Sequence, residues 1–125
     1  MEWYFDELLQ RANMVRQWRK YVAEIAKAVS KVLPDAKLYV FGSVVKGDAV
    51  GGSDVDILVV SQHTPASNLE RAKLKLRIEE EAGLPLYHPF EIHLVDEKEA
   101  EWYYRRVKEL TKADRLLSDS CGGNL

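Results

Sequence analysis

The feature that most constrains this chain is a polar, glycine-rich segment enclosed by two short apolar runs. The runs cover residues 37–41 (KLYVF) and 55–60 (VDILVV), and they are rich in the β-branched and aromatic residues typical of buried strands. The segment between them opens with Gly42-Ser43 and closes on Asp54-Val55-Asp56. Because this segment is too polar to lie in a core, it predicts a loop between two buried strands.

The two aspartates at the end of this loop predict a metal site. Side chains alternate between the two faces of a strand, so Asp54 and Asp56 are expected on the same side, with Val55 pointing away. Carboxylates this close repel each other unless a cation or a proton lies between them. Hard oxygen ligands suit Mg²⁺ or Mn²⁺. The alternative, that the aspartates only cap a turn or a helix, is disfavoured by the Gly-Ser pair upstream.

The Gly-Ser pair at the start of the loop predicts an anion site. Backbone N–H groups at a glycine turn, together with a serine hydroxyl, can hold phosphate oxygens. Gly42 and Ser43 therefore supply phosphate donors close to the metal ligands Asp54 and Asp56. This combination suits a substrate that carries both phosphates and a bound cation.

This arrangement resembles the signature of the nucleotidyltransferase superfamily that includes DNA polymerase β. The resemblance lies in Gly42-Ser43, ten further residues and then Asp54-Val55-Asp56, with Gly47 and Ser53 also matching. The short chain is similar to the minimal branch of that superfamily, the MNT proteins encoded beside HEPN toxins in prokaryotes. The resemblance implies an α/β (α+β) fold, a mixed sheet of about three to four strands flanked by helices.

A third acidic residue is expected at Glu91, early in a third predicted strand over residues 90–95 (FEIHLV). A strand, a crossover helix and a second strand form a parallel pair whose strands begin at the same end of the sheet. Asp54, Asp56 and Glu91 are therefore expected to converge as catalytic residues and metal ligands. The superfamily commonly has Asp at this place, so Glu91 departs from its pattern, and the alternative is a solvated strand residue.

The resemblance also implies the reaction. Two Mg²⁺ ions, or Mn²⁺, would be held by the three acids and would bind the triphosphate of ATP, so that a nucleoside monophosphate passes to a hydroxyl group. Gly42 and Ser43 would hold phosphates, Lys46 would assist, and Gly47 would allow close approach. The residues expected to bind the nucleotide are Gly42, Ser43, Lys46, Gly47 and Ser53.

The histidines are not expected to bind metal. His93 shares a strand face with Glu91, so it either orients a carboxylate, contacts substrate or is a hydrogen-bonded structural histidine, the interpretation that we prefer. His63 and His88 have no partner at the spacing of metal ligands, and no zinc site is predicted.

The rest of the chain predicts helices around these strands. Apolar residues recur at steps of three and four over residues 6–33, which indicates an amphipathic helix, broken at most once. Ser67 followed by Glu70 resembles a capping box for a helix that stops at Gly83. A further helix begins near residue 96 and is expected to run through residue 110, with residue 117 as its furthest end. We expect a single domain over residues 1–117 and a disordered tail over 118–125.

Composition restricts the partners. A net charge of −2 and a pI of about 5.9 argue against direct binding of nucleic acid. The single cysteine, Cys121, allows no internal disulfide, which is typical of a reducing compartment. With no apolar run long enough to cross a bilayer, a cytoplasmic location is expected. Five aromatic residues are expected mainly in the core, with an interface as the alternative: Trp3, Tyr4, Trp102, Tyr103 and Tyr104.

The sequence is compatible with more than one acceptor of the nucleotide. The resemblance to MNT proteins implies AMPylation of a tyrosine in a HEPN toxin, which makes the chain the antitoxin of a toxin–antitoxin system. The alternatives are transfer to a small molecule such as an aminoglycoside or to an RNA end, and an inactive antitoxin that neutralises its partner by binding. A homo-oligomer is compatible with each of them.

Overall fold

The computed structural model describes residues 2–47, 54–107 and 109–113. Within these ranges, nine elements follow one another as α1 (Glu2–Arg16), α2 (Trp18–Val32), β1 (Lys37–Phe41), α3 (Ser43–Lys46), β2 (Val55–Val60), α4 (Asn68–Glu81), β3 (Phe90–Val95), α5 (Glu97–Arg106) and β4 (Thr111–Lys112). The three strands that the sequence predicts are confirmed. Outside the described residues lie Ser53, Cys121, the tail 118–125 and the side chains of Trp3 and Tyr4.

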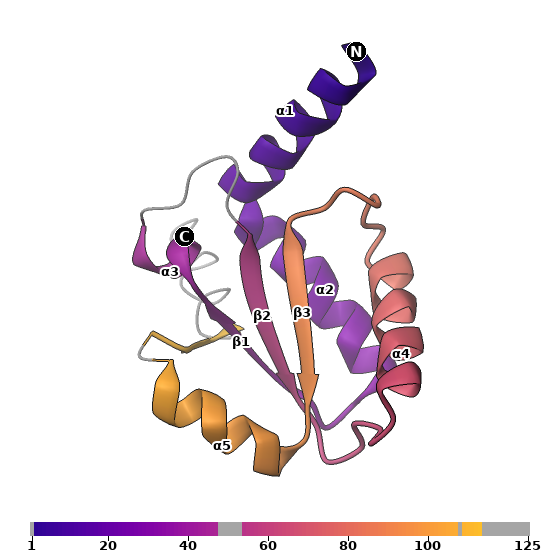
Figure 1. Cartoon of the computed structure of the whole chain (residues 1–125), viewed down its shortest axis with the longest axis vertical. Helices are drawn as coiled ribbons and strands as arrows, with labels where there is room; N and C mark the ends of the chain where they lie inside the picture. Colours follow the sequence, from indigo (N-terminus) through magenta and orange to yellow (C-terminus); the bar gives the residue numbers. More distant parts are fainter. Residues whose placement is uncertain (1, 48–53, 108, 114–125) are drawn as a thin grey trace, which may run out of the picture.

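The four strands form one mixed sheet in the order β3-β2-β1-β4 (Figure 1). β1 pairs antiparallel with β2, and β4 pairs antiparallel with β1. The crossover through α4 makes β2 and β3 parallel, as the sequence predicts. The α/β fold class is confirmed, and β2 lies in the middle of the sheet with a neighbour on each side.

Each face of the sheet has its own core. The larger core contains Val40, Ile57 and Ile92 from the strands, packed with the buried side of α2 and with Ile78 of α4. Figure 1 shows α2 passing behind the sheet. The smaller core gathers Leu58, Val60 and Val95 with Ala100 of α5. Asp56 and Glu91 alternate with the residues of the larger core, so they belong to the α5 side.

The long amphipathic helix is broken once, at Gln17, which separates α1 from α2. The buried residues expected in α2 are confirmed, Val22, Ile25 and Val29 being fully buried. Leu8 is one of the apolar residues of the helix predicted over residues 6–33, but it is 48% exposed. The reason is visible in Figure 1, where the N-terminal part of α1 extends beyond the sheet and has no strand to pack against.

The last predicted helix is shorter than expected. α5 ends at Arg106, because Val107 adopts an extended backbone with φ −99° and ψ 108°, and residues 111–112 form β4 instead. Strand pairing with the edge of β1 satisfies backbone groups there and overrides the helical pattern of the local sequence. The expectation of a helix through residue 110, and as far as residue 117, is therefore wrong within the described residues.

The start of α5 gives a stability prediction. Glu99 N donates to Asp96 Oδ1 at 2.7 Å, and Asp96 N donates to Glu99 Oε1 at 3.0 Å, so the capping box is complete. Replacing an N-cap aspartate by alanine removes one of these bonds, and Asp96→Ala is expected to lower the free energy of unfolding by about 1 kcal/mol. Urea denaturation measures it, with the exposed Lys98→Ala as control. Equal midpoints for the two variants would contradict the role of this cap.

Candidate active site

The predicted site residues meet at the end of the sheet where β1 finishes and β2 and β3 begin. In the register of the three strands, Phe41 lies opposite Asp56, and Asp56 lies opposite Glu91. Directly paired residues of neighbouring strands project to the same face, so Asp56 and Glu91 are adjacent on the α5 side of the sheet. The predicted juxtaposition of these two acids is thus present in the fold.

Gly42 lies directly against Asp56. A Cβ atom built at Gly42 would lie 2.7 Å from Asp56 Oδ2, a distance that side chains do not tolerate. Gly42 also has φ 94° and ψ −163°, a backbone conformation that is essentially restricted to glycine. Only glycine therefore allows the turn after β1 to lie this close to the carboxylate.

The turn after Gly42 is short and ends on a second glycine. Ser43–Lys46 form the single turn α3, and Gly47 ends it in the left-handed conformation with φ 81°. No described atom lies within 4 Å of a Cβ built at Gly47. The positive φ at position 47 favours glycine there. The close approach of Gly47 to a nucleotide stays a prediction. Lys46 is exposed at the end of this turn.

Asp54 precedes β2 and is held by an arginine that the sequence analysis did not single out. Arg11 of α1 forms an ion pair with Asp54, and its Nη1 donates to the carbonyl oxygens of Tyr87 and His88 at 3.1 Å each. The Asp54 side chain is 57% exposed. No local pattern marks Arg11, because its contact with Asp54 joins residues that are 43 positions apart in the chain.

Asp56 is bound by His93. The Nε2 atom of His93 lies 3.3 Å from Asp56 Oδ1, and because a carboxylate only accepts, Nε2 is the donor in this bond. The histidine ring packs beside Phe41 and Tyr103, with centroids 5.6 Å and 6.0 Å away. Of the roles considered for His93, this contact corresponds to the one that orients a carboxylate. His93 thus holds one oxygen of Asp56, whereas Gly42 lies against the other.

Tyr103, which packs beside His93, is a neutral group. Burial raises the pKa of its phenol, and the negative charges of Glu99 and Asp56 raise it further. The phenol therefore stays protonated at neutral pH and adds no charge beside Asp56.

The carboxylates suit Mg²⁺ by their chemistry, since each supplies hard oxygen ligands. In the described part of the chain, however, no group of three or more acidic, histidine or cysteine side chains lies close enough to share a cation. Asp56 and Glu91 are neighbours, whereas Asp54 is paired with Arg11. In a three-acid metal site, the cation would therefore compete with Arg11 for Asp54. The assignment of Asp54, Asp56 and Glu91 as metal ligands stays a prediction.

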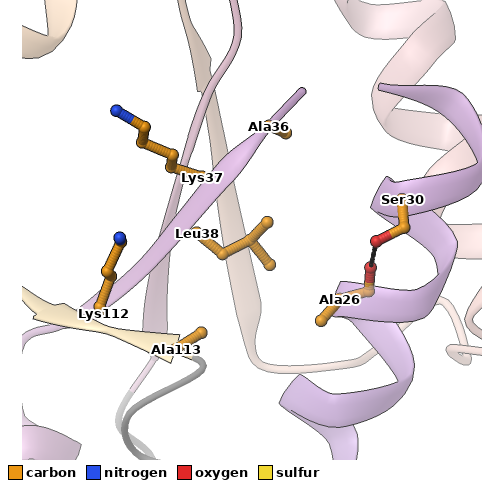
Figure 2. Close-up of a pocket in the computed structure, with 7 residues that line it drawn as sticks. All are labelled: Ala26, Ser30, Ala36, Lys37, Leu38, Lys112 and Ala113. Atoms are coloured by element: carbon orange, nitrogen blue, oxygen red, sulfur yellow. Dashed lines mark hydrogen bonds between the residues drawn. The ribbon is translucent and has the colours of Figure 1, made fainter. Parts of the chain in front are cut away.

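Two cavities lie at opposite ends of β1. One, of about 340 Å³, opens beside Gly42 and Lys46 and is bordered by the end of α5. The other, of about 300 Å³, lies where β1 begins, between α2 and β4, as Figure 2 shows. Its lining consists of Ala26, Ser30, Ala36, Lys37, Leu38, Lys112 and Ala113. No acidic side chain lines this second cavity among the described residues, whereas the first is bordered by Gly42, which lies against Asp56.

Two aromatic residues of α5 differ from expectation. Trp102 is 52% exposed and Tyr104 is 45% exposed, whereas both were expected mainly in the core. α5 buries Ala100 and part of Tyr103 against the sheet, which turns the flanking positions toward solvent. This leaves exposed aromatic surface beside the candidate site.

The fold and the site together define a class of protein. A mixed sheet that sets a Gly-Ser turn against an aspartate of the adjacent strand, with a second acid on the next strand, is the arrangement of a polymerase-β-like nucleotidyltransferase domain. The family profile described as "Nucleotidyltransferase domain" matches residues 22–114, and this chain belongs to that family.

Solved structures agree with this assignment. The chain is similar to the crystal structure of a protein inferred to be a nucleotidyltransferase, with 29% identity and a TM-score of 0.58 over 73% of this chain and 95% of that one. A second such protein, from Sulfolobus solfataricus, has 24% identity and a TM-score of 0.52 over 85% of each chain, and it supports the fold. No curated protein matches the chain. Among the described helices, none has both the length and the apolar character needed to cross a membrane.

Proposed function

We propose that this protein transfers AMP from ATP, in a metal-dependent reaction, to a tyrosine hydroxyl of a partner HEPN toxin, and so acts as an antitoxin. The observation that supports transfer most directly is the pairing of Asp56 with Glu91 on one face, with Gly42 against Asp56. The choice of acceptor rests on the resemblance to MNT proteins, because the Gly42-to-Asp56 motif itself is that of the whole superfamily.

In the proposed reaction, the site residues of this chain have different roles. Asp54, Asp56 and Glu91 would hold Mg²⁺, which when bound lowers the pKa of the acceptor hydroxyl and neutralises phosphate charge. Glu91 is the base that accepts the hydroxyl proton. The hydroxyl oxygen bonds to the α-phosphorus, the bond from that phosphorus to the bridging oxygen breaks, and pyrophosphate leaves. His93 keeps Asp56 oriented through its 3.3 Å contact.

A transfer assay tests the proposal. The purified protein is mixed with ATP labelled in the α-phosphate, Mg²⁺ and the product of the neighbouring gene. Label on a tyrosine of the partner is the expected result, and it should be missing when EDTA replaces Mg²⁺. Label only on an added aminoglycoside or RNA would instead identify a different acceptor class.

One observation favours a second candidate, the antitoxin that acts by binding alone. Arg11 neutralises Asp54, and the described acids do not form a cluster of three, as would suit a chain that no longer binds metal. In the same assay, a tight complex with the partner that carries no label on either protein would favour this candidate.

Arg11 gives a prediction that separates the two candidates. If Asp54 binds a cation, Arg11 competes with that cation, and the Arg11→Met variant is expected to bind Mn²⁺ about two- to fivefold more tightly, as suits a partly exposed ion pair. The paramagnetic effect of Mn²⁺ on water relaxation measures this without catalysis. Arg16→Met, on the same helix and exposed, is the control. Unchanged Mn²⁺ affinity in Arg11→Met would count against Asp54 as a ligand.

A further inference from the structure

The first helix carries an apolar stripe that no other described part of the chain covers. Phe5, Leu8 and Leu9 of α1 are 61%, 48% and 54% exposed, although all of them are large apolar side chains. They recur at steps of three and four, so they lie on one side of the helix in successive turns. Single exposed apolar residues are common on protein surfaces, but a row of them with charges at its border is typical of an interface.

α1 is attached to the rest of the molecule by its other side. Gln10 and Arg11 form hydrogen bonds with the loop that precedes β3, and Met14 is buried in the larger core. With about 3.6 residues per turn, these side chains leave the helix on the side away from Phe5 and Leu9. Figure 1 shows the first turns of α1 extending beyond the sheet. The apolar stripe therefore faces outward, where a second molecule can reach it.

The charges beside the stripe match those of the same helix in reverse. Asp6 and Arg16 are both exposed and lie on the same flank of the stripe, Asp6 near its start and Arg16 beyond its end. Asp6 forms no ion pair with another described residue, and Arg16 Nη2 donates to Asn13 Oδ1 at 3.3 Å. In an antiparallel pair of identical helices, equal flanks meet, so Asp6 of each copy lies toward Arg16 of the other. A parallel pair would instead bring like charges to the same level.

We propose that α1 pairs with α1 of a second copy of this chain, in antiparallel orientation, to form a twofold-symmetric dimer with Phe5, Leu8 and Leu9 at its centre. A twofold interface uses the same surface of both copies, so Leu8 of one packs against Leu9 of the other. Because Arg11 belongs to the same helix, the pairing also supports the element that contacts Asp54. The inference does not depend on the proposed nucleotide transfer.

Sedimentation velocity of the full chain tests the pairing. The unmodified protein is expected to dimerise with a Kd on the order of 10 µM, because an interface made by one pair of helices is small. Leu9→Glu places a charge at the centre of the interface in both copies and is expected to weaken dimerisation about tenfold or more. Leu69→Glu makes the same change at a 65% exposed leucine of α4, and it should dimerise like the unmodified protein. Equal melting temperatures establish that the variants are folded.

A charge swap tests the antiparallel orientation. Asp6→Arg and Arg16→Asp are each expected to weaken the dimer about two- to fivefold, because an exposed ion pair is lost twice in a twofold-symmetric interface. The double variant restores opposite charges and should regain most of the affinity of the unmodified protein. A loss in the double variant equal to the two single losses combined would overturn this orientation.

Each outcome of sedimentation bears on the inference. An unmodified protein that remains a monomer at its highest soluble concentration would overturn the pairing. A dimer that Leu9→Glu and Leu69→Glu leave equally intact would place the interface elsewhere, which also overturns it. If a monomeric unmodified protein binds the product of the neighbouring gene and Leu9→Glu does not, the stripe takes that partner and not a second copy. Labelling of the partner is a separate measurement, so its failure would leave the dimer standing.

Discussion

The Asp56→Asn variant is expected to lose nucleotide transfer by about a thousandfold or more while its fold is retained. Asparagine preserves the size of the side chain but removes the charge that a divalent cation requires. Asp56 lies in β2, whose backbone is paired with both β1 and β3, so the sheet does not depend on its carboxylate. The initial rate of labelling of the partner measures the loss, and the melting temperature measures the fold.

The control for this variant is Glu80→Gln, which makes the same change of acid to amide on the exposed surface of α4. It should label the partner at the rate of the unmodified protein. Asp54→Asn is expected to lose transfer as well, although its carboxylate lies outside the sheet and is engaged by Arg11. Full activity in a purified Asp56→Asn sample would overturn the assignment of this carboxylate to the metal.

The sequence alone predicts the part of the site that the sheet builds. β1, β2 and β3 are short apolar runs between turn residues, and such runs have few alternatives to strands. Once β2 and β3 are joined by a helix, their parallel orientation follows, so both strands begin at the same end of the sheet. The register observed there pairs Asp56 with Glu91. Gly42 was predicted as a phosphate-binding residue, but its contact with Asp56 follows from the antiparallel register of β1 with β2.

The contacts that the sequence does not predict are those between distant elements. Arg11 on α1 pairs with Asp54, and Arg106 on α5 lines a cavity with Lys46, yet neither arginine differs in its local pattern from the solvated residues around it. The end of α5 could not be predicted for the same reason. The local sequence would continue the helix, but pairing of β4 with the free edge of β1 stops it. Tertiary contacts determine these features, and the spacing of residues along the chain does not encode such contacts.

Gly42→Ala is expected to lose nucleotide transfer by about a hundredfold or more, a larger effect than its cost in stability suggests. The new methyl group would lie 2.7 Å from Asp56 Oδ2, and the carboxylate can relieve this clash by rotating away from His93. The catalytic group is then misplaced. The backbone at φ 94° and ψ −163° adds strain of about 1–3 kcal/mol, which should appear in urea denaturation.

The Gly83→Ala variant distinguishes the effect of backbone strain from the effect of a misplaced Asp56 carboxylate. Gly83 also has a positive φ, of 72°, but no described atom lies within 4 Å of a Cβ built there, and it follows α4 rather than a strand of the site. It should lose about 1 kcal/mol of stability and keep its rate of transfer. Because both variants add one methyl group at a left-handed glycine, a rate that falls only in Gly42→Ala isolates the contact with Asp56. Equal rates in the two variants would mean that the close approach of the turn to this carboxylate has no part in the reaction.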